Sequence, residues 1–482
     1  MTVSYGDDDP IAAFATIPGN SALTLIRCSG KGSIELAASV FSSPKKLINT
    51  DGNRIAHGWI TSASEKIDEV LISVFRCPAS YTGEDSLDIS CHGGFSAGHA
   101  VLKTLKAAGF RDALPGEFTF RAFMNGKLDL TRSESVMEIV SAKTDTGRRH
   151  AVQRLSGLLE TEIYDIKKML IEVLAGAEIF LDYSEDEIEA DTDETAGRLP
   201  NRELAGEALV KLEKLASSWQ REKIYQEGIF AVIAGRPNAG KSSLFNLLLR
   251  EDRSIVTGIP GTTRDWIEAW VSIGGIPVRL ADTAGLQVSL DPVEKLGIQR
   301  SRELLYDADL ILYLIDGTVG LHDEDRDFIT SYKQPQKPFI LLWNKADLEP
   351  MLPFKPGTLN EANGRSFQST EYSPISISAK TGEGIQELSE AIAAAIQLQS
   401  DRAPDDANTS QNAALGTARQ KVLVDSACTA VKEAILLADR QEPLDLIAPL
   451  LRDAVNSLGE ITGEVSTADI LEEMFSRFCV GK

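Results

Sequence analysis

The chain has 482 residues, which at roughly 100 to 200 residues per domain predicts two to four domains. Its composition, 43% hydrophobic and 25% charged, is typical of globular proteins and excludes a disordered or collagen-like chain. The 71 acidic and 49 basic side chains give a net charge of -22, which argues against a protein that coats nucleic acid or anionic membranes. Any contact with RNA therefore requires a local basic site.

The cysteines and the N-terminus indicate the compartment. Five scattered cysteines form no CxxC pair, so neither a disulfide framework nor a zinc ribbon is predicted. Acidic residues at 7–9 stand where a signal peptide is basic, and no apolar run approaches the roughly 18 residues of a membrane span. We expect a cytoplasmic protein without a membrane partner.

The first part of the chain predicts an α/β domain followed by a helical one. Up to about residue 118, helical patterns alternate with short apolar runs bounded by glycine, proline and aspartate. The runs that predict strands are residues 11–16, 23–28, 70–76 and 87–91. From 133 to 182, apolar residues recur every three or four positions, which predicts helices with breaks near Gly147 and Gly157.

A second α/β region follows Gly228. Apolar strand runs alternate there with helices, which predicts a mostly parallel, doubly wound sheet. The runs are residues 229–234, 278–281, 310–315, 339–343 and 375–377. Residues 400–412, rich in Asp, Ala, Pro, Asn and Ser, predict a linker, and helical patterns then return at 430–438, 447–458 and 470–478.

Helical segments on both sides indicate that this α/β region is inserted into a helical domain. The predicted N-terminal domain covers residues 1–122. The helical domain has two parts, 123–222 and 399–482, and the inserted domain covers 223–398.

The inserted region contains a phosphate-binding motif. Residues 235–242, GRPNAGKS, match GxxxxGK[ST] between a predicted strand and a predicted helix. In such a loop, backbone N–H groups close around phosphate oxygens, Lys241 holds the β- and γ-phosphates, and Ser242 places a hydroxyl on Mg²⁺. A glycine-rich turn without a ligand is the alternative.

Further motifs follow the P-loop in order. Asp282, in DTAG, ends a strand where a carboxylate can hold the Mg²⁺ shell, and two threonines at 262–263 can supply a switch hydroxyl. Asp347, in NKAD at 344–347, can accept both N–H groups of a guanine edge, which adenine does not offer. With SAK at 378–380, the set resembles the Ras-like GTPase superfamily and implies GTP rather than ATP.

One position departs from the Ras-like pattern. Leu286 stands where such switches commonly carry glutamine, and leucine cannot orient a water molecule. Gln287 and Glu294 are nearby polar candidates, although Glu294 is alternatively an exposed carboxylate at the start of a helix.

The residues predicted to contact the nucleotide are Asn238, Ala239, Gly240, Lys241, Ser242, Ser243, Thr257, Gly258, Ile259, Pro260, Gly261, Thr262, Thr263, Asp282, Thr283, Ala284, Gly285, Asn344, Lys345, Asp347, Ser378, Ala379 and Lys380.

Both ends of the chain carry a more specific resemblance. The GTPase region has Asn238 inside the P-loop, TGIPGTTRD at 257–265, and an inserted position. The other motifs are YTGE, HGG, PGEFTFRAFMNGKLD, GEITGE and FSRFCVGK, at residues 81–84, 92–94, 115–129, 459–464 and 475–482. Together they resemble the MnmE (TrmE) family of tRNA-modifying GTPases over essentially the whole chain.

The resemblance implies an architecture and an activity. The N-terminal α/β domain would form a homodimer and bind 5-formyl- or methylene-tetrahydrofolate, beside a helical domain and an inserted GTPase domain. With the FAD protein MnmG (GidA), in a heterotetramer or larger complex, the family adds an aminomethyl or carboxymethylaminomethyl group to C5 of the wobble uridine of certain tRNAs. The carbon comes from the folate, and GTP hydrolysis drives conformational change.

The resemblance also implies roles for single residues. Potassium would be held by Asn238, Thr257, Ile259 through its carbonyl and Thr262, magnesium by Ser242 and Thr263, and folate by Arg27, Glu84, Lys127 and Lys482. Glu294 would position the attacking water. Cys479 is a further candidate for a functional residue, with a buried apolar thiol as the alternative.

Two other functions fit part of the sequence. One is a regulatory or ribosome-assembly GTPase switch without tRNA-modifying chemistry, and the other is a folate-using one-carbon enzyme with a regulatory GTPase domain. The P-loop set alone does not separate them, whereas the N- and C-terminal motifs favour the modification enzyme.

Overall fold

The computed structural model describes residues 5, 9–63, 65–182, 199–251, 268–282, 303–331, 338–348, 374–399, 413–465 and 468–481. The chain divides into two compact units. Unit 1 comprises Met1–Met137, Arg154–Glu213 and Ala418–Lys482, and unit 2 comprises Glu138–Gln153 and Lys214–Thr417. The chain thus leaves unit 1 and later returns to it, as expected for an inserted domain. The boundaries predicted after residues 122, 222 and 398 stay predictions.

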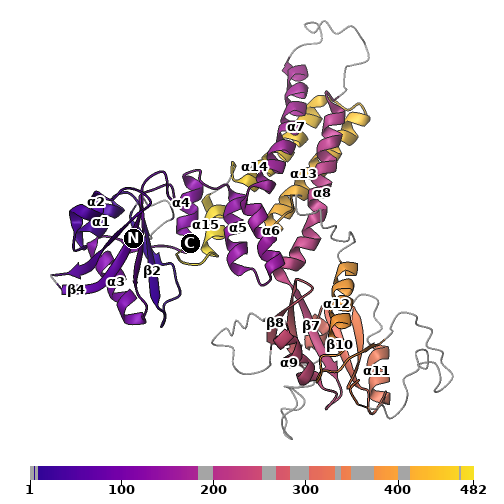
Figure 1. The fold of residues 1–482 in the computed structure, drawn as a ribbon. Coiled ribbons are helices and arrows are strands. Elements are labelled where there is room, and N and C mark those ends of the chain that lie inside the picture. The colour runs from indigo at the N-terminus through magenta and orange to yellow at the C-terminus, as the bar shows by residue number, and fades with distance from the viewer. Residues whose placement is uncertain are drawn as a thin grey trace. The chain divides into compact units, whose positions relative to one another are not determined.

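Unit 1 begins with a six-stranded sheet (Figure 1). Its strands are β1 (Ile11–Phe14), β2 (Leu23–Ser29), β3 (Arg54–Ser62), β4 (Glu65–Phe75), β5 (Ser86–His92) and β6 (Arg111–Asp112). The order is β3-β4-β5-β2-β1-β6, and every neighbouring pair is antiparallel except β1 and β6. Helices α1 (Ser33–Ser39), α2 (Pro44–Ile48) and α3 (Phe95–Ala108) share their buried residues with the sheet in one core.

The predicted strands of this region are present, but sequence analysis missed β3. Its inward positions include Ala56 and Ile60, both fully buried, with Gly58 between them. A Cβ on Gly58 would lie 2.4 Å from the ring of Phe41, so the glycine is needed for packing. Because the central inward residue has no side chain, the apolar alternation that identifies a strand is interrupted.

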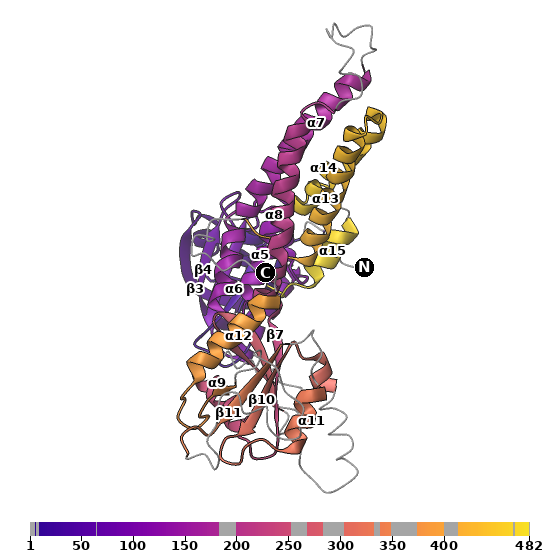
Figure 2. The same ribbon diagram turned by 90° about the vertical axis from the view of Figure 1, so that its right-hand side faces the viewer.

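The helical part of the chain confirms the periodicity of the sequence. Its helices are α4 (Glu117–Met124), α5 (Leu130–Ser141), α6 (Asp145–Leu155), α7 (Leu158–Asp182), α8 (Arg202–Glu227), α13 (Ala418–Asp439), α14 (Leu444–Thr462) and α15 (Ala468–Ser476). Helix α14 packs against both α7 and α13, so segments far apart in sequence lie side by side (Figure 2). No helix in the described part of the chain is long and apolar enough to cross a membrane.

One predicted helix break is misplaced. The break near Gly157 is confirmed, but Gly147 lies inside α6, and the chain breaks at residues 142–144 instead. The N–H of Gly147 donates to Thr144 Oγ1 at 3.1 Å, so Thr144 caps the start of α6. A Cβ on Gly147 would lie 3.0 Å from the Tyr225 carbonyl oxygen, so this glycine permits close packing and does not end a helix.

Unit 2 contains the predicted doubly wound sheet. Its strands are β7 (Ile229–Gly235), β8 (Glu268–Ile273), β9 (Ile276–Asp282), β10 (Leu310–Asp316), β11 (Phe339–Asn344) and β12 (Ile375–Ser376), in the order β12-β11-β10-β7-β9-β8. All pairs are parallel except β8 with β9. Helices α9 (Lys241–Glu251) and α12 (Ile385–Gln399) share one apolar core with the sheet, and α11 (Asp323–Ser331) packs against another. Burial on both faces explains why these strands are continuous apolar runs.

The β8–β9 hairpin packs against the start of α6, within unit 2. Lys143 Nζ lies 3.3 Å from the ring centroid of Trp270 on β8. A Cβ on Gly275, in the turn of the hairpin, would lie 2.6 Å from Thr146 Oγ1. Burial lowers the pKa of Lys143, and the positive charge of Arg279 lowers it further. The segment before and at the start of α6 is therefore part of the same packed body as the sheet.

Candidate functional site

The P-loop connects the end of β7 to the start of α9. Its backbone has positive φ at Gly235 (139°), Asn238 (64°) and Gly240 (100°), a region that favours glycine and tolerates asparagine. A Cβ on Gly240 would lie 2.2 Å from Asn344 Nδ2, so a larger residue does not fit. Successive backbone N–H groups in such a turn form a concavity that binds anions.

Lys241 is the first residue of α9 and only 5% of it is exposed. Its Nζ donates to the carbonyl oxygens of Gly235 (2.8 Å) and Arg236 (2.9 Å), so the loop curls around the ammonium group. Burial lowers the pKa of Lys241, and the charge of Asp282 opposes that shift. A desolvated ammonium group at a helix N-terminus suits an anionic ligand such as phosphate.

Ser242 and Asp282 lie together beside the P-loop. The parallel pairing of β7 with β9 places Asp282 opposite Ile233, at the same end of the sheet as the loop. Ser242 Oγ donates to Asp282 Oδ2 at 2.7 Å, and Asp282 is buried. A hydroxyl and a carboxylate are the oxygen donors that Mg²⁺ prefers next to phosphates. These two residues therefore fit the predicted magnesium site.

The base-recognition motifs meet at the neighbouring strand ends. Asn344 Nδ2 donates to the Ala239 carbonyl at 2.7 Å, and Asn344 Oδ1 accepts from the Ala379 N–H at 2.9 Å. Asn344 thus ties the P-loop to the SAK segment. Ser378 Oγ donates to Asp347 Oδ1 at 2.7 Å and orients an exposed carboxylate. Motifs separated by more than 100 residues form one site here.

Lys345 has a partner that sequence analysis missed. Its Nζ lies 2.5 Å from Asp316 Oδ2, at the end of β10. The only sequence signal for Asp316 is its position directly after an apolar strand run, where polar residues of parallel sheets gather. Ser243 and Lys380, which were predicted to contact nucleotide, are exposed at this end of unit 2.

Part of the predicted site lies outside the described residues. These positions are Thr257, Gly258, Ile259, Pro260, Gly261, Thr262, Thr263, Thr283, Ala284, Gly285, Leu286, Gln287, Glu294 and Lys482, as well as the predicted linker 400–412. Their assignments stay predictions, including the water-positioning role of Glu294 and most of the potassium ligands.

In unit 1, the predicted folate residue Arg27 lies on β2. Its Nε donates to Asp88 Oδ1 at 3.0 Å and its Nη2 to Asp88 Oδ2 at 3.3 Å. The guanidinium carbon lies 5.8 Å from the ring centroid of Tyr81, in the YTGE segment. About a quarter of the Arg27 side chain is exposed, so the guanidinium group is oriented and still accessible.

The YTGE segment at 81–84, which contacts Arg27 through Tyr81, also contains Glu84 and packs against Lys127. Ser29, two residues after Arg27 on the same face of β2, donates to Glu84 Oε2 at 2.8 Å, and Arg121 Nη1 lies 3.2 Å from both Glu84 oxygens. Lys127 Nζ donates to the Pro78 carbonyl at 3.1 Å. A Cβ on Gly83 would lie 3.4 Å from Lys127 Cγ. The loop at 81–84 therefore contains Glu84 and contacts Arg27 and Lys127, the other two described folate candidates.

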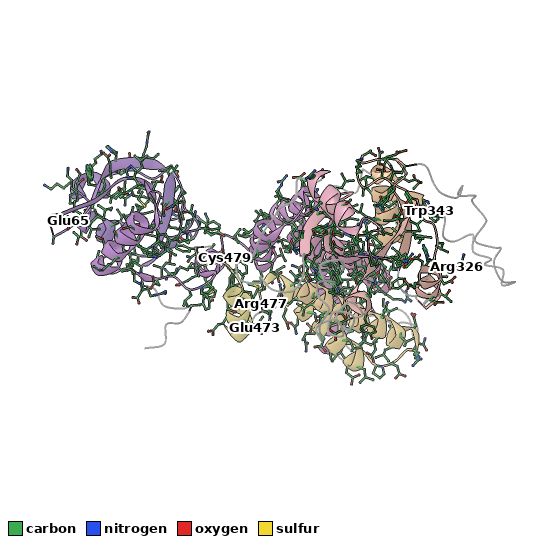
Figure 3. The ribbon with its side chains drawn as sticks, turned by 90° about the horizontal axis from the view of Figure 1, so that it is seen from below. Glu65, Arg326, Trp343, Glu473, Arg477 and Cys479 are labelled. Carbon is green, nitrogen blue, oxygen red and sulfur yellow. The ribbon has the colours of Figure 1, made fainter. Side chains whose placement is uncertain are left out.

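The C-terminal tail reaches the same part of unit 1. Cys479 follows α15 (Figure 3), and its carbonyl oxygen accepts from the Gly116 N–H at 3.3 Å. A Cβ on Gly481 would lie 2.2 Å from the Phe14 carbonyl oxygen on β1, which pairs with β2 next to Arg27. Phe478 is buried but the Cys479 side chain is exposed, so the alternative of a buried apolar thiol is wrong.

Comparisons with known proteins cover almost the whole chain. A family model described as the MnmE helical domain matches residues 130–479, and one described as the GTP-binding protein TrmE N-terminus matches residues 10–127. The tRNA modification GTPase MnmE of Treponema denticola is 43% identical over 487 residues, with 99% of each chain covered. That of Carboxydothermus hydrogenoformans is 39% identical, with 98% of this chain and 100% of the relative covered.

Among solved structures, Era Y63A of Aquifex aeolicus bound to GDP·AlF4- is 25% identical and covers 42% of this chain and 66% of that chain. The TM-score is 0.28, too low to bear on the fold. The two family models and the full-length relatives agree with the motifs assembled above. The chain belongs to the MnmE (TrmE) family of tRNA modification GTPases.

Proposed function

We propose that this GTPase acts in tRNA modification by adding an aminomethyl or carboxymethylaminomethyl group to C5 of the wobble uridine, with MnmG as partner and a tetrahydrofolate as carbon donor. The observation that supports it most is the tail. Residues of the chain terminus lie against Gly116 and β1, beside the strand that carries Arg27. A switch that only recruits partners has no need for an exposed cysteine on a tail that packs against the N-terminal sheet.

Guanine would be read by Asp347. Its carboxylate accepts one hydrogen bond from Ser378, which fixes its orientation at the end of β11. Two carboxylate oxygens can accept the N1–H and the exocyclic amine of guanine together, and this pair distinguishes guanine from adenine. Asn344 holds this segment against the P-loop, so base and phosphate recognition share one rigid frame.

Hydrolysis would be carried by charge placed around the phosphates. Lys241 would bind the β- and γ-phosphates, and Ser242, Asp282 and Thr263 would hold Mg²⁺, which neutralises charge that develops on the phosphate oxygens. Asn238, exposed in the P-loop, would hold K⁺ with Thr257, Ile259 and Thr262. Because Leu286 cannot orient water, Glu294 would do so.

The folate would bind in unit 1. Arg27 and Lys127 can pair with folate carboxylates or ring acceptors, Glu84 can accept from the pterin N–H edge, and Lys482 adds a cation from the tail. Tyr81, next to Arg27, offers an aromatic face. We further propose a homodimer formed by the N-terminal domains and a complex with MnmG that presents the tRNA to the folate.

The test is nucleoside analysis of tRNA from a deletion strain. Complementation by the parent chain should restore the modified wobble uridine. A chain that lacks residues 479–482 should fail to restore it while its purified form still hydrolyses GTP, because the tail belongs to unit 1 and the P-loop to unit 2. If the wobble uridine of the deletion strain is still modified, the regulatory switch is favoured. If the truncated chain restores the modification, the tail has no part in the chemistry.

A further inference from the structure

The ends of β10 and β11 in unit 2 are closely packed against each other. β10 pairs with β11 in parallel, and the register places Asp316 opposite Asn344. The Gly317 N–H donates to the Asn344 carbonyl at 2.8 Å. A Cβ on Gly317 would lie 2.6 Å from that same oxygen and 2.7 Å from the Trp343 ring, so only glycine allows this approach. The turn after β10 is therefore fixed against the NKAD segment.

The Asp316 carboxylate uses its two oxygens for different partners. Oδ1 accepts from the Thr318 hydroxyl at 2.6 Å and from the Thr318 N–H at 3.0 Å. Oδ2 accepts from Lys345 Nζ at 2.5 Å. Burial raises the pKa of Asp316, but the bonds from Lys345 and Thr318 outweigh it and hold the pKa below its usual value. Thr318 thus fixes the carboxylate with one oxygen facing the lysine.

Lys345 has a strained backbone conformation and a flexible side chain, so its ammonium group needs a partner to hold it in place. Its φ is +69°, which a residue with a Cβ adopts at the expense of strain. Its flexible four-carbon side chain would otherwise sample many rotamers. The residue before it, Asn344, is already bonded to the P-loop. The ammonium group of Lys345, in the NKAD motif, is fixed by Asp316.

We propose that Asp316 is a positioning residue for guanosine nucleotides, which acts by holding Lys345 in the orientation that receives the nucleoside. The inference rests on the GTP site proposed above and adds to it a residue from a different strand. The side-chain bonds of Asp316 go to Thr318 and to Lys345 of the base-recognition motif. Its effect should therefore be the same for GTP and GDP, which share the nucleoside.

A double-mutant cycle tests this role in the full chain. Asp316→Asn keeps an oxygen for Thr318 but turns an amide toward the ammonium, and it should weaken GTP and GDP binding about tenfold each. Turnover at saturating GTP should stay within about twofold, so that KM rises while kcat does not. In a Lys345→Met background, Asp316→Asn should change affinity by less than about twofold, because its partner is already gone.

The matched control is Asp323→Asn in α11 of the same unit. Asp323 also pairs with a cation, Arg326, at 3.1 Å, but its side chain is 94% exposed. Affinity of this variant for both nucleotides should equal that of the parent. If Asp316→Asn does not fold, as judged by its circular dichroism, Thr318→Val replaces it in the cycle. This variant removes the hydroxyl bond to the carboxylate but keeps the bond from the backbone N–H, so it should give a smaller loss in the same direction.

Two results would overturn the inference. One is an additive loss in the double variant, which would mean that Asp316 acts without Lys345. The other is a fall in kcat at unchanged KM. The proposed GTP site has a separate test, because Asp347→Asn should weaken GTP and improve xanthosine nucleotide binding whatever Asp316 does. Failure of that exchange would reject the base-reading assignment, whereas an additive cycle alone would reject only the role of Asp316.

Discussion

The predicted nucleotide site in unit 2 depends on tight backbone packing around its side chains, whereas the proposed folate site in unit 1 depends on contacts between side chains. In the P-loop, close approaches leave no space for a Cβ at Gly235 and Gly240, and the Asn344 side chain bonds to a carbonyl and an N–H group. Around Arg27, the contacts are ion pairs and hydroxyl bonds between side chains, with Asp88 and Ser29 as examples. The first kind of site should fail when one atom is added, and the second should weaken gradually when one side chain is removed.

Gly240→Ala should have the largest effect. The new Cβ would meet Asn344 Nδ2 at 2.2 Å at a φ of +100°, so the tie between the P-loop and the NKAD segment must shift. We expect GTP affinity to fall about 100-fold, measured by titration with a fluorescent GTP analogue.

Gly320→Ala is the matched control for that change. Gly320 has a φ of +85° in the same unit, and nothing lies within 4 Å of a Cβ built on it. It bears the backbone strain without the clash, so affinity should stay within about threefold of the parent. Equal losses in the two variants would attribute the effect to strain alone and weaken the contrast between the two sites.

Asn238→Gly should affect the response to potassium. Glycine accepts the φ of +64° at this position, so the variant removes the amide oxygen without backbone strain. Turnover of the parent should rise when potassium replaces sodium at constant ionic strength, and the variant should lose about tenfold in potassium and little in sodium. A parent protein with the same turnover in both salts would remove the potassium site.

Arg27→Ala should weaken tetrahydrofolate binding by about fivefold, because a partly exposed charged contact is lost while Glu84 and Lys127 remain. Isothermal titration with 5-formyl-tetrahydrofolate measures it. GTP hydrolysis should not change. Arg54→Ala, an exposed arginine on β3, is the control. Complete loss of folate binding in a folded Arg27→Ala protein would contradict gradual weakening, and an unchanged affinity would remove Arg27 from the site.

The smallest effect is expected at a position outside both sites. Thr144→Ala removes the cap of α6 and should lower stability by about 1 kcal/mol, which corresponds to a Tm lower by about 2–4 °C. Thr144→Ser keeps the acceptor oxygen and should restore most of the Tm, as measured by scanning calorimetry. Affinity for GTP and folate should be that of the parent in both variants; a change in either would show that the site concerned depends on α6.

The same contrast explains what the sequence could predict. Lys241 and Ser242 were identified because a backbone-built loop needs fixed residue types at fixed spacing, and Asp282 because it ends a strand beside that loop. Asp316 was missed, since one carboxylate after a strand forms no pattern. Only the family resemblance groups Arg27, Glu84 and Lys127, because residues 57 and 43 positions apart leave no periodic signal. Strand β3 escapes prediction for another reason, because the glycine at its centre interrupts the apolar alternation.

The packing of Lys143 and Thr146 on the β8–β9 hairpin determines how this protein can be cut. A fragment that starts at 223 and ends at 398 would contain every nucleotide motif, yet it would lack the residues that cover Trp270 and the turn at Gly275. Such a fragment would lose the cation–π contact on Trp270 and the packing of Thr146 on the hairpin turn. The compact unit that contains the P-loop is therefore not one uninterrupted stretch of the chain. A fragment that keeps these contacts would also include the segment at residues 138–153, joined through a short artificial connection.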